Sequence, residues 1–248
     1  MELKTILERP LFYFPWLHAA ILLKRRNPDI NKLAWISLLN RGQVVLDIGA
    51  NRGNYTSFFA RKVGPKGRVY AFEPVPETCD ELRIRCLNLD NVCVYQVGLS
   101  DVCGPATIHI PGNDFAQASL EIQTDGSWAK GDMVRHIAID LRTLDSWVRE
   151  VGLERIDFIK IDVEGAEMRF LRGARDTLQT FGPALYMEIE RRWQQSFGTT
   201  PSDVIKFLGD LGYRRILKPV INGIQINFIE VSVDDIERGD FLFLRDVV

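Results

Sequence analysis

A short apolar segment that runs into a glycine turn is the first place in the chain where chemistry can be expected. Residues 44–48 are apolar except for Asp47, and Gly49 and Gly53 precede a helical pattern that begins at about Asn54. In a doubly wound α/β sheet, a nucleotide-like ligand docks at the carboxyl end of the first strand. This segment therefore predicts a strand, a ligand-binding turn and a helix in succession.

The residues of the turn narrow the class of ligand. A dinucleotide-binding turn has a glycine at its middle position so that the backbone can approach a pyrophosphate, and this chain has Asn51 there. A P-loop requires Gly-Lys-Ser or Gly-Lys-Thr at the start of the helix, and this turn lacks it. The turn suits a nucleoside without phosphates, with the acid Asp47 close by. S-adenosylmethionine, which has a sulfonium and a zwitterionic tail, fits this description. A nicotinamide-dependent oxidoreductase is the alternative enzyme class.

Polar residues also follow the next two predicted strands. Glu73 ends the strand predicted over residues 68–72, and an acid there can accept hydrogen bonds from both ribose hydroxyls of a nucleoside. Ser100 and Asp101 follow the strand predicted over residues 92–97. By the same topology, these two residues are expected to reach the edge of the adenine.

Carboxylates are crowded at the ends of two later strands. Asp162, Glu164 and Glu167 fall within six residues after the strand predicted over residues 157–161. Such a group repels itself unless solvent, a metal ion or a cationic ligand relieves it, and a sulfonium is such a ligand. Glu188 and Glu190 lie two apart in the next strand, so alternation places both on one face, toward the cleft or toward solvent.

One of these acids can serve as a base if the reaction is methyl transfer to a hydroxyl. The transfer is an in-line displacement that depends on positioning. A hydroxyl is a weak nucleophile, and a general base is typically worth about 10²–10⁴-fold. Asp162 is the first candidate, as base or as metal ligand, and Glu188 is the second. His109 and His136 rank lower because a single histidine in a strand is more often structural. No set of metal ligands is assigned.

The elements that position these residues alternate between strand and helix from residue 43 onward. This alternation predicts an α/β fold with a mostly parallel sheet of about seven strands and helices on both faces. Between residues 98 and 140 the alternation stops, and two strand-like segments flank a Pro-Gly-Asn-Asp turn. A hairpin-like insertion is expected there, at the edge of the sheet where substrate specificity would be determined.

The first 41 residues differ from the rest and are interpreted as a helical arm, followed by a single α/β domain at 42–248. They contain seven Lys or Arg and three Asp or Glu, a local charge of +4. The apolar run at residues 11–23 is shorter than the ~20 residues that span a bilayer. One hypothesis is an anchor that makes weak membrane-surface contact through residues 10–26. The favoured hypothesis is an arm that packs over the active-site mouth or against a second subunit of a homodimer.

Composition excludes several classes of protein. The chain has 248 residues, 46% of them hydrophobic, and a net charge of −2, which gives no support for nucleic-acid binding. Its four cysteines form no C-x-x-C pair, so they favour reduced thiols and a cytoplasmic location over zinc or disulfides. The cysteines are Cys79, Cys86, Cys93 and Cys103.

Several ordered motifs together resemble the FkbM family of methyltransferases over roughly residues 43–215. They are Val-Leu-Asp-Ile-Gly-Ala-Asn-Arg-Gly-Asn-Tyr-Thr at 45–56, Phe-Glu-Pro at 72–74, Gly-Leu-Ser-Asp at 98–101, Thr-Leu-Asp at 143–145, Ile-Lys-Ile-Asp-Val-Glu-Gly-Ala-Glu at 159–167, Leu-Arg-Gly-Ala at 171–174 and Met-Glu at 187–188. As an ordered set, they are more specific than the glycine turn alone.

The resemblance implies a class I methyltransferase fold, with S-adenosylmethionine as the methyl donor. It also implies O-methylation of a hydroxyl on a small-molecule or glycan acceptor, such as a sugar or a polyketide-like natural product. A membrane-surface or scaffold protein with a degenerate fold is the non-enzymatic alternative, and the intact Asp47 and Glu73 argue against it. The residues expected to form the cofactor site are Asp47, Gly49, Ala50, Asn51, Gly53, Thr56, Glu73, Ser100 and Asp101.

Overall fold

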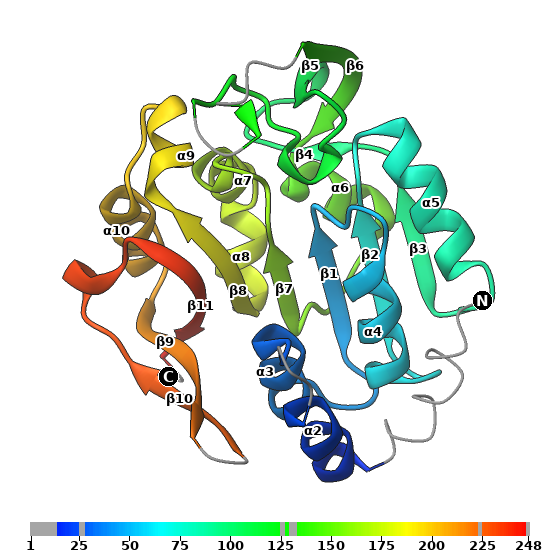
Figure 1. Cartoon of the computed structure of the whole chain (residues 1–248), viewed down its shortest axis with the longest axis vertical. Coiled ribbons are helices and arrows are strands. Elements are labelled where there is room, and N and C mark those ends of the chain that lie inside the picture. Colours follow the sequence, from blue (N-terminus) through cyan, green and yellow to red (C-terminus); the bar gives the residue numbers. More distant parts are fainter. Residues whose placement is uncertain (1–13, 25–27, 125–126, 129–132, 223–224, 247–248) are drawn as a thin grey trace.

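The computed structural model describes residues 14–24, 28–124, 127–128, 133–222 and 225–246. Its main sheet has eight strands in the order β10-β9-β11-β8-β7-β1-β2-β3 (Figure 1). The five strands from β8 to β3 are parallel, whereas β11, β9 and β10 pair antiparallel at the other edge. The predicted mostly parallel α/β fold is confirmed. The strands are β1 (Val44–Ile48), β2 (Arg68–Phe72), β3 (Val92–Tyr95), β7 (Phe158–Ile161), β8 (Ala184–Glu190), β9 (Tyr213–Asn222), β10 (Gln225–Glu230) and β11 (Arg238–Arg245).

Helices cover both faces of this sheet because the apolar residues of the central strands alternate between two cores. Leu46 and Ile48 of β1 belong to the core beneath α6 (Leu144–Val151), α7 (Glu167–Gly173), α8 (Arg175–Phe181) and α10 (Pro201–Asp210). Val45 belongs to the opposite core, beneath α2 (Pro15–Leu23), α3 (Ile30–Leu38) and α4 (Asn54–Val63). Burying these apolar side chains is the main source of stability, at about 25 cal/mol per Å².

Local signals begin and end several helices where the sequence predicts. α4 ends at Gly64, and α5 (Pro76–Cys86) begins with a proline, which is suited to the first helical turn. At the start of α10, Thr200 accepts a hydrogen bond from the backbone N–H of Asp203, whose side chain accepts one from the N–H of Thr200. This reciprocal cap satisfies two backbone donors that would otherwise lack partners.

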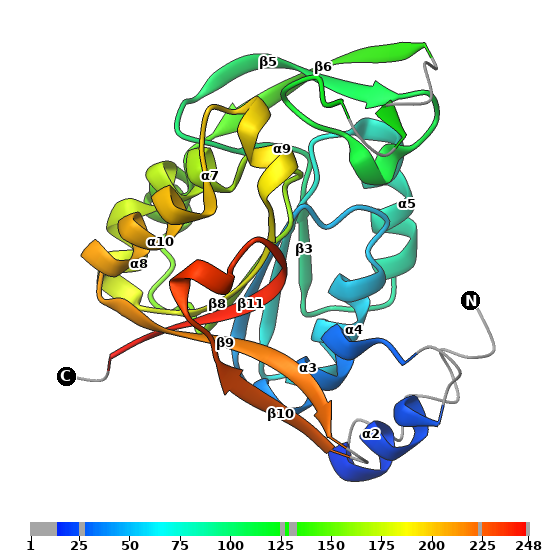
Figure 2. The same cartoon turned by 60° about the vertical axis from the view of Figure 1, so that its left-hand side comes forward.

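A second, three-stranded sheet lies over the carboxyl ends of the main strands (Figures 1 and 2). The antiparallel pair expected within residues 98–140 consists of β5 (Gly104–Pro111) and β6 (Val134–Arg142), and the short β4 (Gly98–Leu99) adds to β6 in parallel. The short helix η2 (Phe115–Gln117) follows β5. The insertion therefore places η2 and the residues after it close to the ligand-binding edge.

The N-terminal helices pack directly on the main sheet. Trp35 of α3 is 1% exposed and makes edge-on contacts with Phe59 of α4 and Tyr186 of β8. Asn31 donates to Asp240 of β11 and accepts from the Tyr186 hydroxyl. Across the described part of the chain, every helix is too short or too polar to cross a membrane. Residues 10–13 and 25–26, on which the membrane-contact hypothesis partly rests, lie outside the described residues.

Candidate active site

Polar side chains meet at one edge of the main sheet. On one face of the neighbouring strands, apolar residues are followed by polar residues toward the carboxyl end of the strand. In β7 this face carries Phe158 and then Lys160, and Asp162 follows the strand. Asp47 of β1 is in register with Lys160, which is in register with Tyr186 of β8. Because all these strands are parallel, their carboxyl ends bring the polar positions together above the core of α3 and α4.

The glycine turn after β1 has the geometry that its sequence suggests. Gly49 has a φ of 72°, and a Cβ atom there would lie 1.8 Å from the carbonyl oxygen of Asp162, so only glycine fits. Asn51 has a φ of 48°, a left-handed conformation that asparagine tolerates better than most residues. Asn51 thus takes the backbone shape that a glycine would provide, and it directs its N–H toward Glu73.

The carboxylate of Glu73 fastens this turn to the start of α5. Its Oε2 atom accepts from the N–H of Asn51 at 2.8 Å, and its Oε1 atom accepts from the N–H of Val75 and the hydroxyl of Thr78 at 3.0 and 2.9 Å. Glu73 is 6% exposed, and its burial raises the pKa of the carboxyl, although the three donors act in the opposite direction. Each oxygen retains accepting capacity, so the carboxylate can also receive ribose hydroxyls.

A first cavity of about 360 Å³ extends from Glu73 to Asp162. Its roof is η2 and the residues up to 120, and its apolar walls suit an adenine ring. Asn51 and Gly49 form the part of the wall next to the turn, and Trp193 lines the wall near the acidic end. The apolar residues are Ile48, Phe72, Val97, Leu99, Ile108, Phe115, Leu120, Ile139, Leu141 and Val163.

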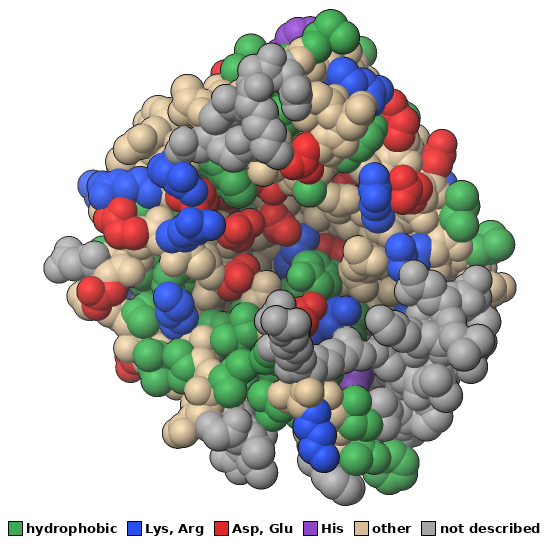
Figure 3. All heavy atoms as spheres, viewed as in Figure 1, with side chains coloured by type: hydrophobic (Ala, Val, Ile, Leu, Met, Phe, Trp, Pro, Cys, Tyr) green, Lys and Arg blue, Asp and Glu red, His purple; other side chains and the backbone are tan. Residues whose placement is uncertain are grey.

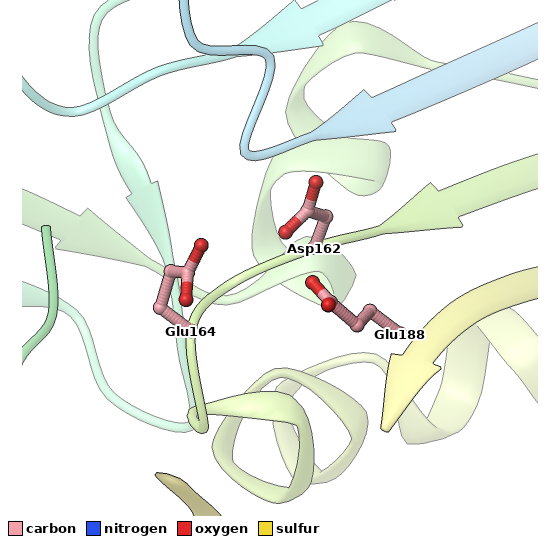
Figure 4. A group of neighbouring side chains, drawn as sticks. All are labelled: Asp162, Glu164 and Glu188. Atoms are coloured by element: carbon pink, nitrogen blue, oxygen red, sulfur yellow. The ribbon is translucent and has the colours of Figure 1, made fainter. Parts of the chain in front are cut away.

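A carboxylate cluster lies at one end of this cavity and consists of Asp162, Glu164 and Glu188. The three side chains point toward one another from the end of β7, the loop before α7 and the end of β8 (Figure 4). One oxygen of each lies within 4.8 Å of the others, a spacing that a divalent cation can bridge. Acidic side chains also gather in the hollow at the centre of this face (Figure 3).

Protons relieve part of the repulsion within the carboxylate cluster. Burial and the charge of Asp162 raise the pKa of Glu164 to about 10 and that of Glu188 to about 9. Glu188 also shares a hydrogen bond with Asp162. The backbone of Glu164 is left-handed, with a φ of 52°, and its carbonyl oxygen accepts from the hydroxyl of Ser119 at 3.0 Å. The insertion thus helps to hold the loop that carries Glu164.

Lys160 is a residue of the site that the sequence analysis missed. Its side chain lies 3.3 Å from Asp47 and 3.1 Å from Asp162, and it donates to the carbonyl oxygen of Gly49 at 2.9 Å. Although burial alone would lower the pKa of Lys160, the carboxylates of Asp162 and Asp47 raise it. A lysine inside the otherwise apolar strand Phe-Ile-Lys-Ile was the available signal, because a buried lysine requires a partner.

Five residues predicted to contact the cofactor do not line the cavities at this edge. Asp47 and Thr56 are 0% exposed and bond to each other at 2.6 Å beneath the turn. Ser100 is also buried, since its carbonyl packs against Gly173 of α7. These three side chains are covered by protein in this structure, so their contact with the cofactor stays a prediction. The other two residues outside the cavity walls are Gly53 and Asp101.

Two further acids, Glu167 and Glu190, and the two histidines do not line the cavities. Glu188 and Glu190 lie opposite Asp240 and Arg238 of β11, as alternation along one face predicts. Only Glu188 lines the cavity, because the buried carboxylate of Glu190 pairs with Arg192 and Arg238. Glu167 is buried against the N–H of Gly165 and the amide of Gln194. The two histidines pair with each other in the insertion, Nδ1 to Nδ1 at 2.8 Å, away from the cavity walls. They are His109 and His136.

The fold has a counterpart among solved structures. The crystal structure of Methyltransferase FkbM from Methylobacillus flagellatus matches with a TM-score of 0.54 and 16% sequence identity, covering 97% of this chain and 60% of that chain. At this identity the likeness concerns the fold. Together with the parallel sheet and the glycine turn after its first strand, it gives the chain the fold of class I methyltransferases.

The particular family follows from the sequence. The model of the methyltransferase FkbM domain matches residues 47–215, more than half of the chain, and the chain belongs to this family. It is 34% identical over 156 residues to the 2-O-methyltransferase NoeI of Sinorhizobium fredii, covering 58% of this chain and 62% of that protein. It is 27% identical over 168 residues to the hexuronic acid methyltransferase AglP of Haloferax volcanii, covering 67% of this chain and 62% of that protein. The matches thus span less than two thirds of these curated relatives.

Replacing Glu73 by alanine is expected to weaken the binding of S-adenosylmethionine. The change removes the acceptor for the ribose and frees the N–H of Asn51 in the turn. Hydrogen bonds to a charged group contribute about 1.5–3 kcal/mol, so we expect the Kd to rise about 10- to 150-fold. Isothermal titration calorimetry measures this, with Glu73→Gln as the milder control because it retains one acceptor oxygen. An unchanged Kd in the alanine variant would remove Glu73 from the cofactor site.

Proposed function

We propose that this chain transfers the methyl group of S-adenosylmethionine to a hydroxyl oxygen of a sugar-containing acceptor, with Asp162 as the general base. The observation that carries the proposal is the position of Asp162. It lines the same cavity as Glu73, and it belongs to the carboxylate cluster that lines this cavity with it. A nucleoside bound through its ribose to Glu73 would therefore present its sulfonium toward Asp162.

The proposed reaction forms a carbon–oxygen bond, breaks the carbon–sulfur bond and moves one proton from the acceptor to the base. The acceptor oxygen attacks the methyl carbon, and the electrons of the carbon–sulfur bond pass to sulfur, which leaves as the neutral thioether of S-adenosylhomocysteine. The proton of the hydroxyl passes to the carboxylate of Asp162. Lys160 holds this carboxylate in place at 3.1 Å, so its orientation is fixed before the acceptor arrives.

Two features support a polar, sugar-like acceptor. The relatives NoeI and AglP are named as a 2-O-methyltransferase and a hexuronic acid methyltransferase. The cavity is also lined by Glu164, Glu188 and Trp193. Carboxylates can accept hydrogen bonds from several hydroxyls of one ligand, while an aromatic ring gives an apolar contact surface.

Mass spectrometry tests the proposal directly. The chain is incubated with trideuteromethyl-labelled cofactor and a panel of sugars, uronic acids and hydroxylated metabolites. We expect one labelled methyl group on a sugar, and we expect it to survive mild alkaline hydrolysis because it forms an ether. A label that is lost in alkali would show methylation of a carboxylate, and a label on an amine would show N-methylation. Either outcome would contradict O-methylation of a hydroxyl.

The affinity for S-adenosylmethionine is expected to rise between pH 7 and pH 9. Glu188 and Glu164, with pKa values raised to about 9 and 10, retain protons at neutral pH. A permanent sulfonium nearby favours their ionised forms, so binding releases protons and becomes tighter as pH rises. S-adenosylhomocysteine is the matched control, since it has the same amino-acid tail but a neutral sulfur. Equal pH dependence of the two affinities, measured by calorimetry, would show that the sulfonium does not bind beside the cluster.

A further inference from the structure

A second cavity continues the first on the other side of the glycine turn. The two cavities share five lining residues, and the second has a volume of about 580 Å³. A ligand that places its ribose at Glu73 can therefore extend past Gly49 into the second cavity. The shared residues are Gly49, Asn51, Phe115, Ala116 and Asp162.

The walls of the second cavity are mainly polar and include the start of α3. Asp29, the N-cap of α3, and Lys32 in its first turn line it together with Asn54 and Tyr55 of α4. Both α3 residues precede the part of the chain that matches the family model, which begins at residue 47. The N-terminal helix thus contributes directly to a wall of the ligand-binding region.

Three cations line the second cavity, and they differ in how closely each is paired with a carboxylate. Lys160 is buried and lies between two carboxylates, as described above. Arg52 forms an ion pair with Glu81 at 3.3 Å. Lys32 lies 3.8 Å from Asp29 and 5.9 Å from the centre of the Tyr55 ring. Both Lys32 contacts are long, so its ammonium, which has three donors, is the best placed to receive an anionic group.

We propose that Lys32 binds the carboxylate of the amino-acid tail of S-adenosylmethionine in the second cavity. The tail is a zwitterion, and the cavity offers a partner for each charge. Its ammonium group can pair with Asp162, and its carboxylate can pair with Lys32 on the opposite wall. This assignment rests on the proposed placement of the nucleoside at Glu73, and it makes α3 part of the cofactor site.

Calorimetry with two ligands separates this role from a merely structural one. S-adenosylhomocysteine carries the amino-acid tail, and 5′-methylthioadenosine has the same nucleoside and sulfur without it. We expect Lys32→Ala to weaken the binding of S-adenosylhomocysteine about 5- to 20-fold, as for the loss of a partly exposed charge-assisted hydrogen bond. We expect the affinity for 5′-methylthioadenosine to stay unchanged. Lys32→Arg is expected to retain most of the affinity.

The variants are chosen so that each result is decisive. The side-chain change leaves the cap of α3 intact, because that cap uses the backbone N–H of Lys32. Lys24→Ala removes an exposed lysine from the same arm and should bind both ligands normally. The proposal would be overturned if Lys32→Ala lowered the affinity for both ligands equally, or lowered the affinity for neither. If wild-type protein bound neither ligand, the placement of the nucleoside at Glu73 would fail with it.

Discussion

Replacing Asp162 by asparagine is expected to lower kcat by about 10²–10⁴-fold, the usual contribution of a general base. Asparagine has the same shape and keeps a carbonyl oxygen facing Lys160, but it cannot take the proton of the acceptor. The ribose keeps Glu73, the carboxylate of the tail keeps Lys32, and the asparagine oxygen can still accept from the ammonium of the tail, so the Kd of S-adenosylmethionine should rise far less than kcat falls. Single-turnover kinetics with labelled cofactor measure the chemical step, and calorimetry measures binding.

Two control variants make this prediction specific. Asp157→Asn alters a carboxylate just before β7, at the opposite end from the site, and should leave kcat unchanged. Glu188→Gln removes the second candidate base and should lower kcat less than Asp162→Asn does, because the raised pKa of Glu188 keeps it protonated at neutral pH. If Asp162→Asn turns over at the wild-type rate, or if Glu188→Gln has the larger loss, Asp162 is not the base.

Replacing Lys160 by methionine is expected to produce the largest loss of stability at this site. Lys160 is 4% exposed and is paired with Asp47, which is 0% exposed. Removing the cation leaves a buried carboxylate with the hydroxyl of Thr56 as its remaining hydrogen-bond donor within the described structure. Breaking a buried ion pair in this way costs about 3–5 kcal/mol. Urea denaturation measures the free energy of unfolding.

A double variant tests the cause of this loss. In Lys160→Met combined with Asp47→Asn, the buried carboxylate is neutral, so most of the lost stability should return. The two single variants and the double variant form a thermodynamic cycle that isolates the interaction between the two residues. Additive losses would show that the charge pair does not explain the effect. A loss below about 1 kcal/mol in Lys160→Met would contradict the burial argument itself.

The positions of the ligand-binding residues were predictable where they follow the ends of parallel strands. Gly49, Asn51, Glu73 and Asp162 all follow such ends, and topology alone brings those ends to one edge. The left-handed backbone of Asn51 shows a limit of this inference. An asparagine can adopt the conformation of a glycine, so its presence changes the chemistry of the turn more than its shape.

Other features depend on contacts that no local pattern contains. The sequence cannot show that Asp47 faces Lys160, because their register is determined by the pairing of β1 with β7. Ser100 follows a strand as expected, yet α7 covers it. Glu190 does not line the cavity beside Glu188, because its carboxylate pairs with Arg192 of α9 (Arg191–Ser196) and with Arg238 of β11. The approach of Lys32 to the second cavity depends on how α3 packs across the sheet.

A crystal structure of the protein with S-adenosylhomocysteine tests the central claim most directly. We expect both ribose hydroxyls to donate to the carboxylate of Glu73 and the sulfur atom to face Asp162. We also expect the tail to lie past Gly49, with its carboxylate beside Lys32. A nucleoside bound away from Glu73, or a sulfur atom that faces away from the carboxylate cluster, would contradict the proposed site.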